Sequence, residues 1–160
     1  MSRLIYLTIL FLGIITTNVI AQDQSIFTLG EKAKNVNHTG DVWLRELNSA
    51  NDTTINSQIS VAVFAPNAKL NWHKHSAGQI LLITDGIGYY QEKDKSVQIV
   101  KKGDVVRCLP GVEHWHGSTP NIGVTYVAIS PKSTTTWLHP VNDVEYQNIE
   151  KSLANLKSSK

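Results

Sequence analysis

Four of the six histidines in this chain lie in two short segments, His73–His75 and His114–His116. Side chains alternate faces along a β-strand, so two histidines separated by one residue point the same way, about 6 to 7 Å apart. Two imidazoles at that spacing can bind one metal ion. Such a pair also occurs on solvated strand edges and in hydrogen-bonded cores, so it indicates a metal site only when further ligands are found.

Two more side chains can complete such a site. Gln79 has the same strand parity as His73 and His75 and faces them if the strand continues past Ala77. His114 follows a Pro-Gly turn and is the obvious donor from a second strand. The candidate metal ligands are therefore three neutral imidazoles and one amide oxygen, from His73, His75, Gln79 and His114.

His116 and Tyr126 are the candidate catalytic groups for moving a proton. An imidazole has an ordinary pKa near 6.5, whereas a phenol, near 10, needs a shift from a nearby metal. His116 is therefore the preferred base, with packing beside Trp115 as its alternative role. Tyr126 either donates a hydrogen bond to a substrate oxygen or is an ordinary inward-facing aromatic. Ala128 and Ser130 share its strand face and are small, so we expect them to form a substrate-binding wall.

Short strands are predicted to position these side chains. Between residues 53 and 129, β-branched runs alternate with turn residues at a spacing of about 8 to 12, which is typical of an antiparallel sandwich or barrel. One such turn is predicted at Asp85-Gly86. The sequence does not show the alternation of strands and helices that would indicate a parallel sheet. The fold class predicted is all-β. The predicted strands are residues 59–64, 79–84, 88–91, 97–100, 104–108 and 124–129.

The two ends of the chain differ from this pattern. An apolar run from Leu4 to Ile15 follows Arg3 and precedes a Val-Ile-Ala cleavage signal, so we expect a signal peptide and an exported protein, periplasmic or secreted. Its length, about 12 residues, is short of the roughly 20 that the alternative, a permanent membrane anchor, requires. Helical spacing of Ile149, Leu153 and Leu156 predicts a short C-terminal helix capped at residue 142 or 143. The predicted divisions are a signal peptide (1–21), an N-terminal arm and edge strand (22–50), a barrel (51–141), and a C-terminal helix with a frayed tail (142–160).

Composition excludes several classes of function. The chain has 160 residues and 41% apolar composition, which suits one globular core. Lys and Arg number 15 against 13 Asp and Glu and are scattered, which argues against a nucleic-acid partner. The single cysteine, Cys108, excludes an internal disulfide framework and a thiolate zinc finger. Its apolar neighbours predict that it is buried.

The two histidine segments belong to longer motifs that resemble the two signature motifs of the cupin superfamily. The first reads His73-x-His75-x3-Gln79-x6-Gly86, and the second reads Gly103-Asp104-x5-Pro110-Gly111-x2-His114. In most cupins the second-motif histidine joins two histidines and a Glu around a divalent metal inside a small barrel. The resemblance therefore implies a jelly-roll-like antiparallel cupin barrel, with Gln79 standing where that Glu usually stands.

From about Gly40 to Tyr146 the sequence is similar to the small single-domain cupins that include bacterial manganese-dependent hydroxynitrile lyases. This resemblance implies manganese bound by the four candidate ligands. Those lyases carry a basic histidine on the last barrel strand, four residues before a Gln, and Tyr126 and Ser130 stand at those positions here. The basic histidine that those lyases carry is therefore absent here, so cyanohydrin cleavage does not follow from the resemblance, whereas all four metal ligands are present.

The ligand set also bears on the choice of metal and reaction. Gln in place of Glu removes a negative charge, so a bound divalent ion is a stronger Lewis acid and favours anionic oxygen ligands. Mn(II) is expected by resemblance, and Fe(II), Ni(II) or Zn(II) also suit these donors. The leading hypothesis is a metal-dependent lyase acting on a small oxygenated molecule. The alternatives are an Fe(II) dioxygenase and a non-catalytic small-molecule or sugar-binding barrel, and the resemblance implies a homo-oligomer, dimer or larger.

Overall fold

The computed structural model of the protein describes residues 26–34, 36–49, 51–52 and 54–158. The predicted signal peptide, residues 1–21, lies outside the described residues. Within the described part, no helix combines the length and apolar character that crossing a lipid bilayer requires.

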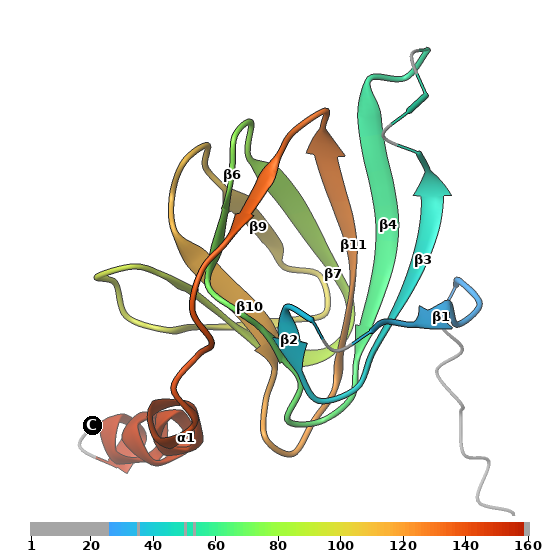
Figure 1. The fold of residues 1–160 in the computed structure, drawn as a ribbon. Helices are drawn as coiled ribbons and strands as arrows, with labels where there is room; N and C mark the ends of the chain where they lie inside the picture. The colour runs from blue at the N-terminus through green and yellow to red at the C-terminus, as the bar shows by residue number, and fades with distance from the viewer. Residues whose placement is uncertain (1–25, 35, 50, 53, 159–160) are drawn as a thin grey trace, which may run out of the picture.

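The described residues form antiparallel strands and one helix, which confirms the predicted all-β fold class. The longest ladder runs in the order β1-β3-β4-β11-β7-β10-β5-β2 and curls into a half-barrel that is open toward the viewer in Figure 1. β12 pairs with β6, β6 pairs with β10, and β8 and β9 both pair with β7. The strands are β1 (Glu31–Lys32), β2 (His38–Thr39), β3 (Val42–Asn48), β4 (Ser57–Phe64), β5 (Lys69–Leu70), β6 (His73–His75), β7 (Gln79–Glu92), β8 (Gln98–Lys101), β9 (Val105–Cys108), β10 (His114–Ser118), β11 (Val124–Pro131) and β12 (Thr135–Trp137), and the helix is α1 (Asp143–Ser158).

The core lies on the concave side of the sheet, where β4, β11 and β7 run side by side. In this part of the sheet Tyr126 is opposite Ala62 on one neighbouring strand and Ile83 on the other. Alternate side chains on these strands pack inward, which is the period expected when one face of a sheet is buried. Cys108 belongs to the same core and is 3% exposed, so its predicted burial is confirmed.

One predicted turn is wrong. Residues 79–84 and 88–91 were expected to be two strands separated by Asp85-Gly86, but they form the single strand β7. Gly86 has φ +73°, and a Cβ there would overlap the carbonyl oxygen of Gly123. The glycine therefore allows β7 to bend as it passes from pairing with β9 to pairing with β8, rather than to reverse direction.

Helix α1 lies outside the barrel (Figure 1). Asn142 caps it, because its Oδ1 accepts hydrogen bonds from the backbone N–H groups of Val144 and Glu145. Tyr146 is fully buried and donates its hydroxyl to the carbonyl of Ser118. The ammonium of Lys69 lies 4.3 Å from the Tyr146 ring centroid. The first turn of the helix is thus fixed to β5 and β10, and β10 carries the site residues His114 and His116.

Candidate metal centre

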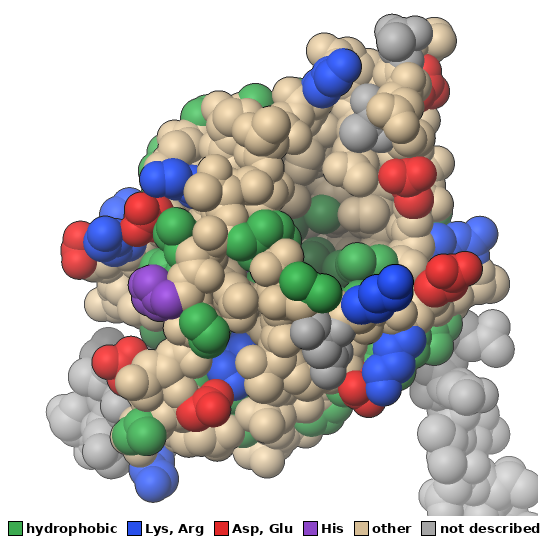
Figure 2. Space-filling model, viewed as in Figure 1, with side chains coloured by type: hydrophobic (Ala, Val, Ile, Leu, Met, Phe, Trp, Pro, Cys, Tyr) green, Lys and Arg blue, Asp and Glu red, His purple; other side chains and the backbone are tan. Residues whose placement is uncertain are grey.

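The half-barrel encloses a cavity of about 490 Å³. Figure 2 shows this face hollowed, with hydrophobic side chains around the hollow. None of the described lining residues is acidic, and Lys34 is the only charged one among them. The polar lining side chains thus lie in a largely apolar wall, as is usual for small-molecule sites. Among them are four imidazoles, those of His38, His73, His75 and His116, and the amide of Gln79.

Strand pairing places the histidines next to one another. His73 lies opposite His114 where β6 pairs with β10, and Trp137 of β12 lies opposite His73 on its other side. Opposite residues in an antiparallel pair have their Cβ atoms about 4.5 to 5.5 Å apart, so their side chains are in contact. The ring centroids of His73 and His114 are 4.3 Å apart, and those of His73 and His75 are 5.0 Å apart.

Backbone carbonyls fix the proton positions on two of these imidazoles. The Nδ1 atoms of His73 and His114 lie 2.8 Å from the carbonyl oxygen of Asn71 and 2.9 Å from that of Val112. A carbonyl only accepts hydrogen bonds, so each Nδ1 carries the proton and each Nε2 keeps its lone pair. Both Nε2 atoms are buried and have no partner. This is the form in which an imidazole binds a metal, with the second ring nitrogen held by an outer hydrogen bond.

The other two imidazoles are held by hydroxyl groups instead. His75 Nδ1 lies 3.0 Å from Thr135 Oγ1, and His116 Nδ1 lies 2.8 Å from the Tyr126 hydroxyl. A hydroxyl can donate or accept, so either ring tautomer is compatible with these contacts. Both Nε2 atoms are again buried without a partner.

Gln79 reaches the cavity by a different route from the one predicted. The strand was expected to continue past Ala77, but β6 ends at His75, and Gly78, with φ +79°, turns the chain before β7 begins at Gln79. Its amide Nε2 donates to Ser130 Oγ at 3.1 Å, and its Oε1 is buried and unpaired. Ser130, predicted to line a substrate pocket, therefore orients Gln79, whereas Ala128 does line the cavity.

Among the described residues, the tightest group of donors joins two of the predicted ligands, His73 and His114, to His116, whereas His75 and Gln79 lie outside that group. The ligand atoms of His73, His114 and His116 all lie within 4.8 Å of one another. The ring of His75 is 5.4 Å from that of His114, centroid to centroid. Neutral, buried and unpaired nitrogen and oxygen donors in one place suit a divalent ion, because burying unpaired polar atoms is costly otherwise. The donor set thus fits a divalent metal.

Burial keeps these side chains neutral. Desolvation lowers the pKa of His73 to about 3 and that of His75 to about 4, and nearby His114 lowers both further than burial alone. Burial likewise lowers the pKa of His114 and takes that of His116 well below its ordinary value. It raises the pKa of Tyr126 well above its usual range, so the phenol stays protonated at neutral pH.

Three functional positions were missed or given another role from the sequence. Trp137 had no assignment, and Thr135 was not considered, yet both line the cavity from β12. Both belong to residues 134–137, and this run of β-branched and aromatic residues is typical of a β-strand. His38, which no motif in the sequence singles out, also lines the cavity. Trp115 has a packing role, since it is 1% exposed and lies against Tyr146.

The hydrogen bond between Thr135 and His75 allows a direct test of whether Thr135 orients the His75 imidazole for metal binding. Thr135→Val keeps the shape of the side chain but removes the hydroxyl, so we expect metal affinity to fall roughly 10- to 100-fold. Thr136→Val, on the exposed neighbouring position of β12, is the matched control. Titration of Mn(II) against a competing chelator measures both. Equal affinities in the two variants would show that His75 is not oriented through Thr135.

Residues 60–130 match the model of a protein family described as "Cupin domain". The chain is 36% identical over 112 residues to (R)-mandelonitrile lyase of Granulicella tundricola, across 68% of this chain and 85% of that protein. Two crystal structures from Thermotoga maritima are also similar. A cupin-like protein has a TM-score of 0.76 and 39% identity, covering 79% of this chain and 97% of its own. A predicted oxalate decarboxylase has a TM-score of 0.56 and 22% identity, covering 68% and 91%, and shows the shared fold alone.

Proposed function

Because this chain belongs to the cupin family, we propose that its histidine cavity is the active site of a metal-dependent lyase acting on a small oxygenated substrate. The observation that carries the proposal is the convergence of buried, unpaired ligand atoms at one cavity, whose lining among the described residues has no acidic side chain. The relative named (R)-mandelonitrile lyase supports a carbon–carbon bond-cleaving reaction of the hydroxynitrile lyase type.

The proposed metal ligands are the Nε2 atoms of His73, His75 and His114 and the Oε1 of Gln79. Mn(II) is the proposed ion, with Fe(II), Ni(II) and Zn(II) compatible with the same neutral donors. Bound there, such an ion supplies Lewis acidity toward a substrate oxygen. Because none of the ligands is charged and no described lining residue is acidic, the ion's charge is not offset within the cavity. An anionic oxygen is therefore the favoured fifth partner.

His116 is the proposed proton-moving group, with Tyr126 as its positioning residue. For Nε2 to take a proton from a substrate hydroxyl, Nδ1 must carry the ring proton. Nδ1 then donates a hydrogen bond to the Tyr126 oxygen. The 2.8 Å contact between these two atoms allows that arrangement. Since burial lowers the pKa of His116, it accepts a proton only from a group made unusually acidic in the cavity.

The apolar lining excludes water and accepts the carbon skeleton of the substrate. Val42, Phe64, Leu70 and Trp137 all contribute to it. Ala128 provides the room beside Tyr126 that we assign to substrate. A small molecule with one reacting oxygen and an apolar body fits a cavity of this size and composition.

We also propose that the protein is exported by residues 1–21, works as a homo-oligomer, and binds neither nucleic acid nor, after signal cleavage, a membrane. The scattered, nearly balanced charges support the absence of a nucleic-acid partner. Exposed apolar side chains at the β1–β3 edge, including Leu29, Leu44 and Leu47, support pairing of copies at that edge.

The proposed function is tested by elemental analysis of the purified protein, followed by a screen of cyanohydrins, aldehydes and unsaturated sugar acids. Cleavage of a cyanohydrin by the Mn(II) form supports the lyase. Dioxygen consumption that depends on iron and is absent with manganese would support a dioxygenase instead. Binding without turnover by any metal form would support a non-catalytic small-molecule or sugar-binding barrel.

Tyr126→His is expected to raise cyanohydrin cleavage roughly 10- to 100-fold, because it adds a second imidazole base facing the same cavity. Tyr126→Phe is the matched control, since it removes the same hydroxyl and adds no base, and we expect no gain from it. Initial rates with mandelonitrile at equal metal content measure the effect. An unchanged rate in Tyr126→His with metal bound would remove the analogy with the lyase.

A further inference from the structure

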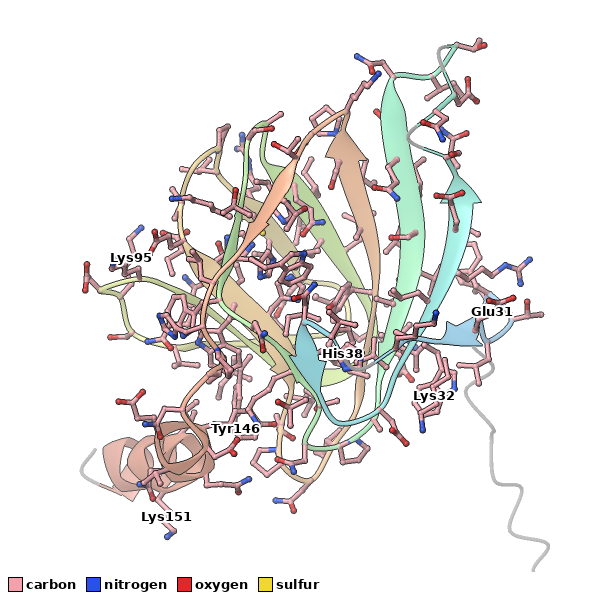
Figure 3. The ribbon with its side chains drawn as sticks, in the orientation of Figure 1. Glu31, Lys32, His38, Lys95, Tyr146 and Lys151 are labelled. Carbon is pink, nitrogen blue, oxygen red and sulfur yellow. The ribbon has the colours of Figure 1, made fainter. Side chains whose placement is uncertain are left out.

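One imidazole that lines the cavity, that of His38, is neither a candidate metal ligand nor the proposed proton-moving group. His38 lies on β2, next to the mouth of the barrel, and is labelled in Figure 3. The arm that carries it also contributes Lys34, Val36 and Asn37 to the lining. The arm is tied to the site, because the N–H of Asn71 donates to the carbonyl of Asn37 at 2.9 Å. The carbonyl of the same Asn71 holds His73.

The ring of His38 has one nitrogen occupied and one free. Its Nδ1 lies 3.1 Å from the carbonyl oxygen of Gly40, so Nδ1 carries the proton and donates it there. Its Nε2 therefore keeps a lone pair. That atom is buried and has no hydrogen-bond partner among the described residues. A buried acceptor of this kind is costly to leave unpaired, which makes it a recognition point for a hydrogen-bond donor.

The sheet register places His38 at a defined separation from His116. Gly117 of β10 is opposite Lys69 of β5, and His38 of β2 is opposite Leu70 of β5. Continuing the first register by one residue sets His116 opposite Leu70. The three residues therefore form one row across the sheet, and all three line the cavity. Because adjacent strands are about 4.8 Å apart, the backbones of His38 and His116 are roughly 10 Å apart.

This row has a polar atom at each end and an apolar side chain between them. A ligand whose reacting oxygen lies beside His116 places its carbon skeleton over Leu70 and its far end at His38. The far end meets an acceptor, so a donor group there gains a hydrogen bond. An unsubstituted apolar end would leave Nε2 unpaired.

We propose that His38 is a specificity-determining residue, which selects substrates carrying an O–H or N–H donor at the end remote from the reacting oxygen. This inference rests on the proposed function only for the position of the reacting oxygen. The substrate class is then a small molecule with an apolar, ring-sized body, a carbonyl-forming oxygen at one end and a hydroxyl or amino group at the other.

Binding of a matched pair of probes tests the proposal without requiring turnover. Benzaldehyde is compared with 3- and 4-hydroxybenzaldehyde by isothermal titration calorimetry of the purified protein, with and without Mn(II). We expect the unsubstituted protein to bind at least one hydroxylated probe about 10-fold more tightly than benzaldehyde, the effect of one hydrogen bond to a buried acceptor. His38→Phe keeps an aromatic ring and removes the acceptor, so the preference for the hydroxylated probe over benzaldehyde disappears.

Lys34→Met is the matched control, because it changes another lining residue of the same arm and leaves the imidazole in place. The preference persists in this variant. A second measurement needs no substitution: the 15N resonance of His38 Nε2 shifts when a hydroxylated probe binds and not when benzaldehyde binds. Equal binding of all three probes, or a preference that survives His38→Phe, would overturn the proposal. Neither result depends on whether the protein cleaves cyanohydrins. Absence of cleavage would contradict the proposed lyase function and leave the binding preference at His38 intact, so the two proposals can be tested independently.

Discussion

His114→Ala is expected to remove most of the metal from the purified protein, with affinity lowered by more than the 10- to 100-fold typical of losing an outer partner of a ligand. His114 comes from the second motif and has no solvent exposure. Its Nδ1 is held by the Val112 carbonyl, so its Nε2 is presented to the cluster in the metal-binding form. Elemental analysis after expression in metal-supplemented medium gives the occupancy, and cyanohydrin cleavage is expected to fall with it.

The matched control is His139→Ala, which removes an exposed histidine beside Trp72 outside the cavity lining. It is expected to leave the metal content unchanged. A thermal unfolding curve recorded without metal separates loss of a ligand from loss of the fold, because only the former leaves a folded, metal-poor protein. Full occupancy in folded His114→Ala would exclude this imidazole from the ligand set and with it the proposed site.

Acidification is expected to unfold the metal-free protein in the range where ordinary histidines begin to protonate. In the folded state the pKa of His73 is lowered to about 3 and that of His75 to about 4, from an ordinary value of 6.5. Between about pH 4 and 6.5 the unfolded chain therefore binds protons that the folded chain does not. The stabilisation is fully present above pH 6.5 and is lost as the pH falls toward the folded-state values.

For each such histidine, the free energy of unfolding falls by about 1.4 kcal/mol for every unit by which the pH is lowered within that window. Two of them give a slope of about 3 kcal/mol per pH unit, and the lowered pKa values of His114 and His116 steepen it further. That is large against a typical domain stability of 5 to 15 kcal/mol. Urea unfolding at pH 7.5, 6.0 and 5.0 in the presence of a chelator measures the slope.

His139→Ala again serves as control and is expected to leave the slope unchanged. Excess Mn(II) should stabilise the protein at pH 7.5, because it binds only the folded, neutral imidazoles, and its effect should weaken on acidification. A free energy of unfolding that stays flat between pH 7.5 and 5.0 would contradict the burial of neutral histidines in the cluster.

The sequence by itself determined which residues can act and much of the local structure that presents them. Strand parity places His73 and His75 on one face, and that face is the cavity face. The β-branched runs identified β4, β7, β8, β9 and β11, although the Asp85-Gly86 turn was wrong. Asn142 was correctly named as a possible helix cap. These features depend on neighbours within a few residues, so they are readable from spacing and residue type.

The tertiary structure alone decided which side chains meet. Strand parity puts His114 and His116 on one face, but they meet His73 only because β10 pairs with β6, and nothing in the spacing of the chain specifies that register. Ser130 orients Gln79 across 51 positions of sequence. His38 enters the cavity only because β2 pairs with β5. Pairing of strands distant along the chain is set by the packing of the whole sheet, and a shift of one residue would turn each side chain to the opposite face.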